Sequence, residues 1–113
     1  MSVVLTKPGV LFNIIAPGGF RILYAIDRAA QSLGVDLTIT SGTDGEHSGP
    51  NDPHHRGEAY DIRSHEFDEP TKQKVLNELM GFLDLEHFYG FLESPGSPNE
   101  HFHIQVKKGT TFP

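Results

Sequence analysis

Two short segments of the chain are rich in side chains that can bind a metal ion or transfer a proton. Residues 52–63 read DPHHRGEAYDIR, and residues 100–105 read EHFHIQ. Neither segment completes a metal site alone, but together they offer two imidazole ligands, one carboxylate ligand and a spare carboxylate. A catalytic zinc site needs these groups: three protein ligands, an open position for water and a general base.

The strands predicted around these segments would bring them together, because side chains point alternately to the two faces of a strand. In residues 101–107 the histidines alternate with apolar residues, and in residues 59–64 Asp61 does the same. If the apolar faces point into the core, Asp61 and His103 face one groove, and the preceding loop can place His54 over it. A His-x-His pair on a strand is often plain solvated surface, so it is the combination of the two segments that predicts a metal site.

Hydrophobic periodicity predicts two helices and four strands. Residues 20–33 repeat apolar side chains at helical spacing, and Gly34 follows as a C-cap candidate. Residues 68–70, Asp-Glu-Pro, open a second helix whose apolar stripe runs to Leu83. The predicted strands are residues 35–40, 59–64, 86–93 and 101–107. The glycine- and proline-rich residues 41–53 predict a loop, and a loop this long in so small a domain is usually functional or disordered. This order favours an α+β fold, a small, mainly antiparallel sheet with helices packed on one face.

Length and composition limit the domain count and the classes of partner. The 113 residues predict one domain, residues 1–113, with an N-terminal arm at 1–19 and a tail at 108–113 that is expected to fray. The formal net charge of −6 argues against binding to nucleic acid or anionic lipid. The chain has no cysteine, which excludes thiolate zinc sites, and no apolar run near the ~20 residues of a membrane span. The first residues lack a signal-peptide pattern, so we expect synthesis in the cytoplasm, and we expect a monomer.

In the two segments 52–63 and 100–105 the chain resembles the zinc D-Ala-D-Ala metallopeptidases and related peptidoglycan endopeptidases, a family that includes phage lysins and the hedgehog signalling domain. The family pattern is roughly Ser-x-His-x-x-Gly-x-Ala-x-Asp, followed far downstream by an acidic residue, two arbitrary residues and His. The chain fits this pattern at His54, Gly57, Ala59, Asp61, Glu100 and His103. The resemblance covers about residues 36–107 and implies a hedgehog/DD-peptidase-like fold.

The resemblance also implies a role for each of these side chains. His54, Asp61 and His103 would be the zinc ligands, which agrees with the nitrogen and oxygen donors that zinc accepts. Glu100 would be the general base that takes a proton from the attacking water. Glu93 is a competing base, because some family members take their base from that region.

His47 and His101 look like the family's accessory histidines, which stabilise the oxyanion or hold the substrate carbonyl. The chain departs from the family at Thr43–Asp44, where many members carry an aromatic residue followed by an arginine that binds a substrate carboxylate. Arg56 and Arg63 are the candidates to replace that arginine. Arg63 lies on the ligand face of its predicted strand, where it is equally placed to pair with the aspartate ligand and orient it.

The function expected from this resemblance is that of a zinc metallopeptidase, a hydrolase that cleaves an amide bond in bacterial peptidoglycan stem peptides. It would be of the D-Ala-D-Ala carboxypeptidase or the L,D- or D,D-endopeptidase type, with a peptidoglycan peptide as its partner. The site of action would be the cell wall after release from the cell, as for phage endolysins.

Two other readings remain open from the sequence. The first is a zinc-stabilised, non-catalytic binding or signalling module of the same fold, in which four protein ligands close around the metal. The second treats His101 and His103 as joint ligands in a cupin-like site, although the short sheet and two core helices argue against a jelly roll.

Overall fold

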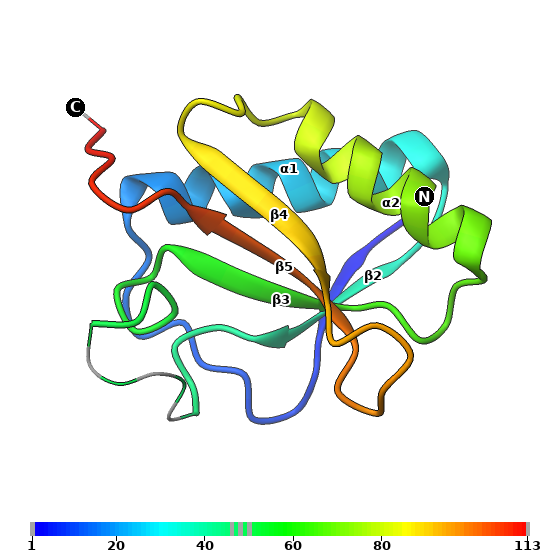
Figure 1. The fold of residues 1–113 in the computed structure, drawn as a ribbon, viewed down its shortest axis with the longest axis horizontal. Helices are drawn as coiled ribbons and strands as arrows, with labels where there is room; N and C mark the ends of the chain where they lie inside the picture. The colour runs from blue at the N-terminus through cyan, green and yellow to red at the C-terminus, as the bar shows by residue number, and fades with distance from the viewer. Residues whose placement is uncertain (1, 46, 48, 50, 113) are drawn as a thin grey trace.

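Five strands and two helices make up the computed structural model, which describes residues 2–45, 47, 49 and 51–112. Their bounds are β1 Val4–Thr6, α1 Pro17–Leu33, β2 Leu37–Ser41, β3 Ala59–Arg63, α2 Glu69–Gly81, β4 Phe88–Glu93 and β5 His101–Val106. The sheet order is β1-β2-β3-β5-β4, in which β1 runs parallel to β2 and the other neighbours are antiparallel (Figure 1). The predicted α+β class with a mainly antiparallel sheet is therefore confirmed.

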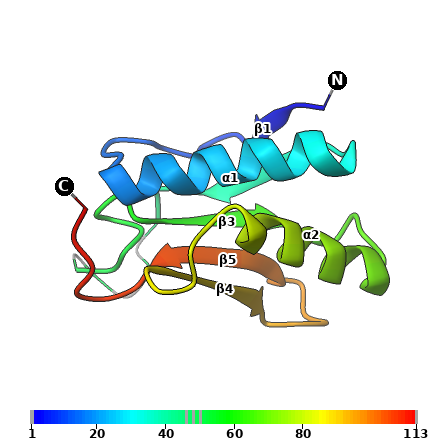
Figure 2. The same ribbon diagram turned by 90° about the horizontal axis from the view of Figure 1, so that it is seen from above.

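Both helices pack against each other on one face of the sheet (Figure 2). The core lies between this face and the helices, and its largest fully buried side chains include Ile22, Ile26, Tyr60, Ile62, Phe102 and Ile104. Full burial of such a side chain stabilises the fold by about 1.5–3 kcal/mol. The other face of the sheet carries no helix of the described residues and is free for polar side chains.

The helix ends follow the sequence signals closely. α1 begins at Pro17, three residues before the predicted start at Phe20, because proline is well suited to the first helical turn. It ends at Leu33, and the following C-cap residue, Gly34, has a φ of 66°, the left-handed conformation expected of a glycine C-cap. At the start of α2, the Asp68 carboxylate accepts a hydrogen bond from the Thr71 N–H at 2.9 Å. None of the helices in the described ranges is long and apolar enough to span a membrane.

The N-terminal arm contains a strand that the sequence did not predict. The Leu37 N–H donates to the Val3 carbonyl at 3.2 Å, and the Lys7 N–H donates to the Ile39 carbonyl at 2.9 Å. These bonds pair β1 with β2. A strand of three residues is too short to show a period of two, so its existence depends on the partner strand.

The C-terminal tail was expected to fray, but it packs on the body of the domain through Phe112. The Phe112 ring stacks on Phe88 with centroids 5.5 Å apart, and the Arg21 guanidinium lies 4.2 Å from the Phe112 centroid. One aromatic side chain is thus enough to hold the described part of this short segment against α1 and β4.

Candidate metal centre

The sheet register places an aspartate and a histidine from distant parts of the chain opposite each other. Asp61 in β3 pairs with His103 in β5, and both point to the face without helices because their neighbours Tyr60 and Ile104 point into the core. His54 reaches the same place from the loop before β3. The convergence of these three residues agrees with the predicted ligand set.

The three side chains present one donor atom each to a common point. Asp61 Oδ1 lies 3.2 Å from His54 Nε2 and 2.9 Å from His103 Nδ1. Neighbouring donors around a tetrahedral zinc with bonds of about 2.0–2.1 Å are about 3.3 Å apart, which is close to these separations. All three residues are buried, with exposed fractions of 3%, 7% and 8% for His54, Asp61 and His103. This group could hold a metal ion.

Each imidazole is oriented by an oxygen on its far side. His54 Nδ1 lies 3.1 Å from the Gly42 carbonyl oxygen, and His103 Nε2 lies 2.8 Å from Gln105 Oε1. These oxygens can only accept, so each ring donates its N–H there. In a neutral ring the other nitrogen then keeps a lone pair that faces Asp61, which is the tautomer a metal ligand requires.

The charge of Asp61 is stabilised by its neighbours. Burial raises the pKa of Asp61, but hydrogen bonds from His103 and His54 outweigh burial and hold the pKa below its usual range. Burial lowers the pKa of His103, whereas hydrogen bonds to Asp61 and Gln105 raise it by more. In the metal-free protein these groups therefore share protons, and a metal ion that binds must displace them.

A second group of possible ligands adjoins the first on its exposed side. The antiparallel register of β4 and β5 places Glu93 opposite His101. Glu93 Oε1 lies 3.3 Å from His101 Nε2 and 3.8 Å from His103 Nδ1. The Glu93 side chain is 43% exposed, so it remains accessible to solvent. Glu93, His101 and His103 could also hold a metal ion.

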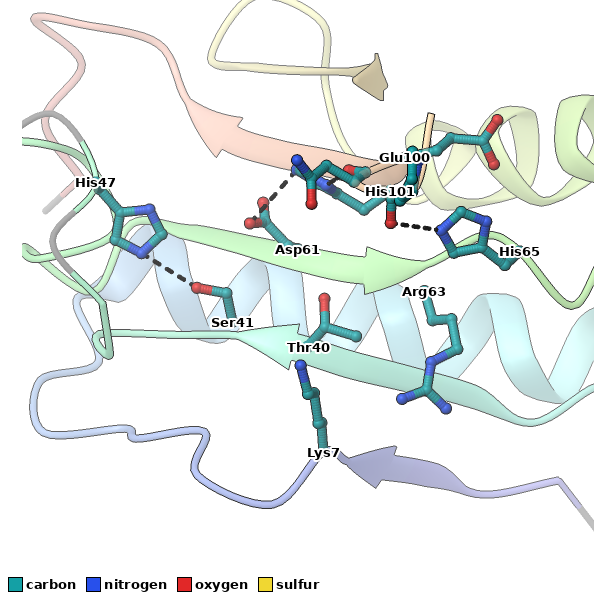
Figure 3. Close-up of a pocket in the computed structure, with 11 residues that line it drawn as sticks. Lys7, Thr40, Ser41, His47, Asp61, Arg63, His65, Glu100 and His101 are labelled. Atoms are coloured by element: carbon teal, nitrogen blue, oxygen red, sulfur yellow. Dashed lines mark hydrogen bonds and ion pairs between the residues drawn. The ribbon is translucent and has the colours of Figure 1, made fainter. Parts of the chain in front are cut away.

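Glu100, the general base that the family resemblance implies, lies on the helix side of the sheet. Its carboxylate contacts Lys72 Nζ at 2.9 Å, the Ser64 hydroxyl at 2.6 Å and the Gly96 N–H at 3.0 Å. Hydrogen bonds from Lys72, Ser64 and Gly96 lower the pKa of Glu100 to about 2. Figure 3 shows the carboxylate pointing away from Asp61. Glu100 and Phe102 are two residues apart, and side chains two apart along an extended strand point to the same face. Because Phe102 points into the core, Glu100 also points to the helix side.

His47 lies beside the metal-binding group, exposed to solvent, and lines the cleft that also contacts Asp61. Its ring stacks on His54, with centroids 3.9 Å apart and planes within 2°. Its Nε2 lies 2.7 Å from the Asp44 carbonyl oxygen. The same atom lies 3.1 Å from Ser41 Oγ, a contact drawn in Figure 3. The packing suits a residue that fixes the ring plane of His54. Its neighbours at 46 and 48, and Pro50, all within the predicted loop, lie outside the described residues.

A cleft of about 410 Å³ opens next to Asp61 and His101. Lys7, which directly follows β1, and Arg63, from β3, line it together with His65 (Figure 3). Within the described part of the chain, no ion pair joins Arg63 to the aspartate ligand. The other candidate cation, Arg56, pairs at 2.9 Å with Glu58 on the surface.

Sequence reasoning gave no role to two groups that prove important to this geometry. Gln105 holds the His103 ring, and its signal was its position two residues after a ligand on the same strand face. The Gly42 carbonyl holds His54. A backbone acceptor of this kind has no signal in the residue types at all.

Comparison of the chain with protein-family models, with curated proteins and with solved structures gives no match.

Proposed function

We propose that this chain is a zinc-dependent peptidase that hydrolyses an amide bond in bacterial peptidoglycan stem peptides, with a hedgehog/DD-peptidase-like fold. The observation that carries the proposal is the convergence of His54, Asp61 and His103, with each imidazole oriented from behind and a solvent-accessible carboxylate alongside. A purely structural His–Asp cluster has no need of the spare carboxylate.

The donor set fits zinc. Two imidazole nitrogens and one carboxylate oxygen match the three protein ligands of many catalytic zinc sites, and the absence of cysteine excludes a thiolate-based structural site. When bound, zinc supplies Lewis-acid polarisation of the scissile carbonyl and lowers the pKa of water to about 7.

We assign the general base to Glu93 in preference to Glu100. The Glu93 side chain is 43% exposed and lies beside the proposed ligand His103, whereas the Glu100 side chain is 2% exposed and contacts Lys72. Glu93 accepts the proton of the attacking water and returns it to the leaving amine. His101 donates its Nε2–H to the oxyanion that develops on the substrate carbonyl.

The cleft supports a substrate that carries carboxylates, as peptidoglycan stem peptides do. Lys7 and Arg63 line the cleft next to Asp61 in a chain whose net charge is −6. At the position of the family's arginine, Asp44 instead accepts hydrogen bonds from the Gly42 N–H at 2.8 Å and the Leu11 N–H at 3.0 Å. Lys7 and Arg63 therefore take over carboxylate recognition in this proposal.

The test is hydrolysis of purified peptidoglycan and of soluble stem peptides, including D-Ala-D-Ala-terminated ones, followed by mass spectrometry of the products. We expect cleavage by the zinc-loaded protein, loss of cleavage with a chelator or in Asp61→Asn, and full cleavage by the surface control Asp84→Asn. A zinc-loaded wild type that leaves every one of these substrates intact would reject the peptidase class.

A zinc-stabilised binding module is the second candidate, because Glu93 and His101 lie near enough to the first group to supply a fourth protein ligand. The visible absorption spectrum of the cobalt-substituted protein distinguishes the two. A band that shifts when a peptide or hydroxamate is added indicates an open position and supports the peptidase. A spectrum that no small ligand changes indicates a closed site and supports the module.

A further inference from the structure

We propose that Glu93, His101 and the second carboxylate oxygen of Asp61 form a second divalent-cation site, and that a zinc ion bound there inhibits the peptidase. The two oxygens of Asp61 face different partners. Oδ1 lies near His54 and His103, at 3.2 and 2.9 Å, whereas Oδ2 lies 3.5 Å from His101 Nε2. Asp61 is thus placed to bridge two ions, an arrangement found in hydrolases whose metals are about 3.5–4 Å apart.

The His101 ring is oriented in the same way as the two ligands of the first group. Its Nδ1 lies 2.6 Å from the Asn99 carbonyl oxygen, which can only accept, so Nδ1 donates. In the neutral ring the Nε2 lone pair then faces Asp61 Oδ2, at 3.5 Å, and Glu93 Oε1, at 3.3 Å. This contact fixes the direction of the ring, as metal-binding imidazoles require.

The two sites differ in strength, because they compete for His103. Its Nδ1 lies 2.9 Å from Asp61 Oδ1 but 3.8 Å from Glu93 Oε1, so the first ion takes it. The second ion is left with Glu93, His101 and Asp61 Oδ2. The Glu93 and His101 side chains are 43% and 21% exposed, and the ordering of a solvated glutamate weakens binding. The second site is therefore the weaker one.

Inhibition follows if Glu93 and His101 act as the base and the oxyanion donor, and this part of the inference rests on the proposed function. A cation on Glu93 Oε1 removes the lone pair that accepts the proton of water. A cation on His101 Nε2 removes the donor for the oxyanion. Excess zinc thus converts an active protein into an inactive one without unfolding it.

The experiment is a titration of the metal-free protein with zinc by calorimetry and with cobalt by visible absorption. We expect two equivalents, the second bound roughly tenfold or more weakly than the first. Glu93→Gln and His101→Gln should each keep the first equivalent and lose the second. Glu86→Gln, which removes an exposed carboxylate just before β4, should keep both. Peptide hydrolysis by the wild type should rise with the first equivalent and fall as the second binds.

Binding of one equivalent by the wild type, or a second equivalent that persists in the Glu93→Gln, His101→Gln double variant, would overturn the second site. Hydrolysis that stays constant while the second equivalent binds would overturn the inhibition. Two equivalents with the expected variant pattern, but no hydrolysis at any zinc concentration, would confirm the site and overturn the proposed peptidase function alone.

Discussion

Gln105 accepts the hydrogen bond on the far side of the His103 ring, opposite Asp61. Replacement of Gln105 by leucine leaves the His103 N–H without its acceptor, which lies at 2.8 Å. We expect zinc affinity to fall about 10–100-fold, measured by competition with a chromogenic chelator. Gln105→Glu keeps an acceptor and should retain the affinity. Equal affinities for the leucine and glutamate variants would show that the ring is held by packing alone.

Glutamine substitutions at Glu93 and Glu100, the two glutamates near β5, should have different effects on kcat. We expect Glu93→Gln to lose about 10²–10⁴-fold in kcat on a stem peptide while it retains the first zinc equivalent, because the amide cannot accept a proton. Glu100→Gln should keep kcat within a few-fold, since its carboxylate lies among Lys72, Ser64 and Gly96. The reverse pattern in steady-state kinetics would return the base to Glu100.

Glu100 should also make stability depend on pH. Its pKa of about 2 in the folded protein is below the usual value, so its carboxylate stabilises the fold fully above about pH 4.5, and the contribution is lost as the pH falls through about 2. Urea unfolding should therefore show wild type more stable than Glu100→Gln at about pH 6, with the gap narrowing towards about pH 3. Glu69→Gln is the matched control, because Glu69 also contacts Lys72, at 3.0 Å, but is exposed. A gap that does not change with pH would contradict the assignment.

At the level of single residues, the sequence predicted which side chains meet but not all of their directions. His54, Asp61 and His103 follow from strand alternation and spacing, and the structure brings them together. Glu100 matched the family pattern, but the alternation of side chains along β5 puts it on the same side as the core residue Phe102. The position of Glu93 required the β4–β5 register, which depends on a turn whose geometry the residue types do not specify.

Among the elements, the loop before β3 depends on close backbone contact at Gly57. Its φ is +71°, and an added Cβ would lie 2.2 Å from the Ile14 carbonyl oxygen. We expect Gly57→Ala to lower the free energy of unfolding by about 1–3 kcal/mol and to weaken zinc binding, because the loop that carries His54 must move. Gly81→Ala, whose added Cβ meets none of the described atoms within 4 Å outside its own helix, should lower neither quantity. Calorimetry and zinc competition on both variants provide the check, and a neutral Gly57→Ala would show that the contact is unimportant.

The helices and the long strands could be predicted because each carries its own signal. α1 and α2 have caps and apolar stripes, and β3 and β5 alternate clearly. β1 could not be predicted, since its three residues are held by hydrogen bonds to β2, more than thirty residues away. The packing of Phe112 is likewise a long-range contact, which local patterns do not encode.

For the molecule as a whole, zinc should act as a cross-link. Its proposed ligands come from the loop, β3 and β5, and His103 is 42 residues from Asp61. Free zinc at a hundred times its dissociation constant adds about 2.7 kcal/mol to the free energy of unfolding, so Tm should rise by about 10 °C. Scanning calorimetry at increasing zinc concentration measures this. Asp61→Asn should abolish the dependence, and a wild-type Tm that is insensitive to zinc would contradict the site.

The separation of the two sheet faces has a consequence for how this protein tolerates change. In β5 the even-numbered Phe102 and Ile104 are part of the core, whereas His101 and His103 lie on the opposite face. Consider a saturation library of β5 that is selected in two ways. Selection for soluble accumulation in cells should remove variants at Phe102 and Ile104, and selection for turnover should also remove variants at His101 and His103. During evolution, substitutions on the face that carries the histidines could then change the chemistry, while the core face continues to support folding.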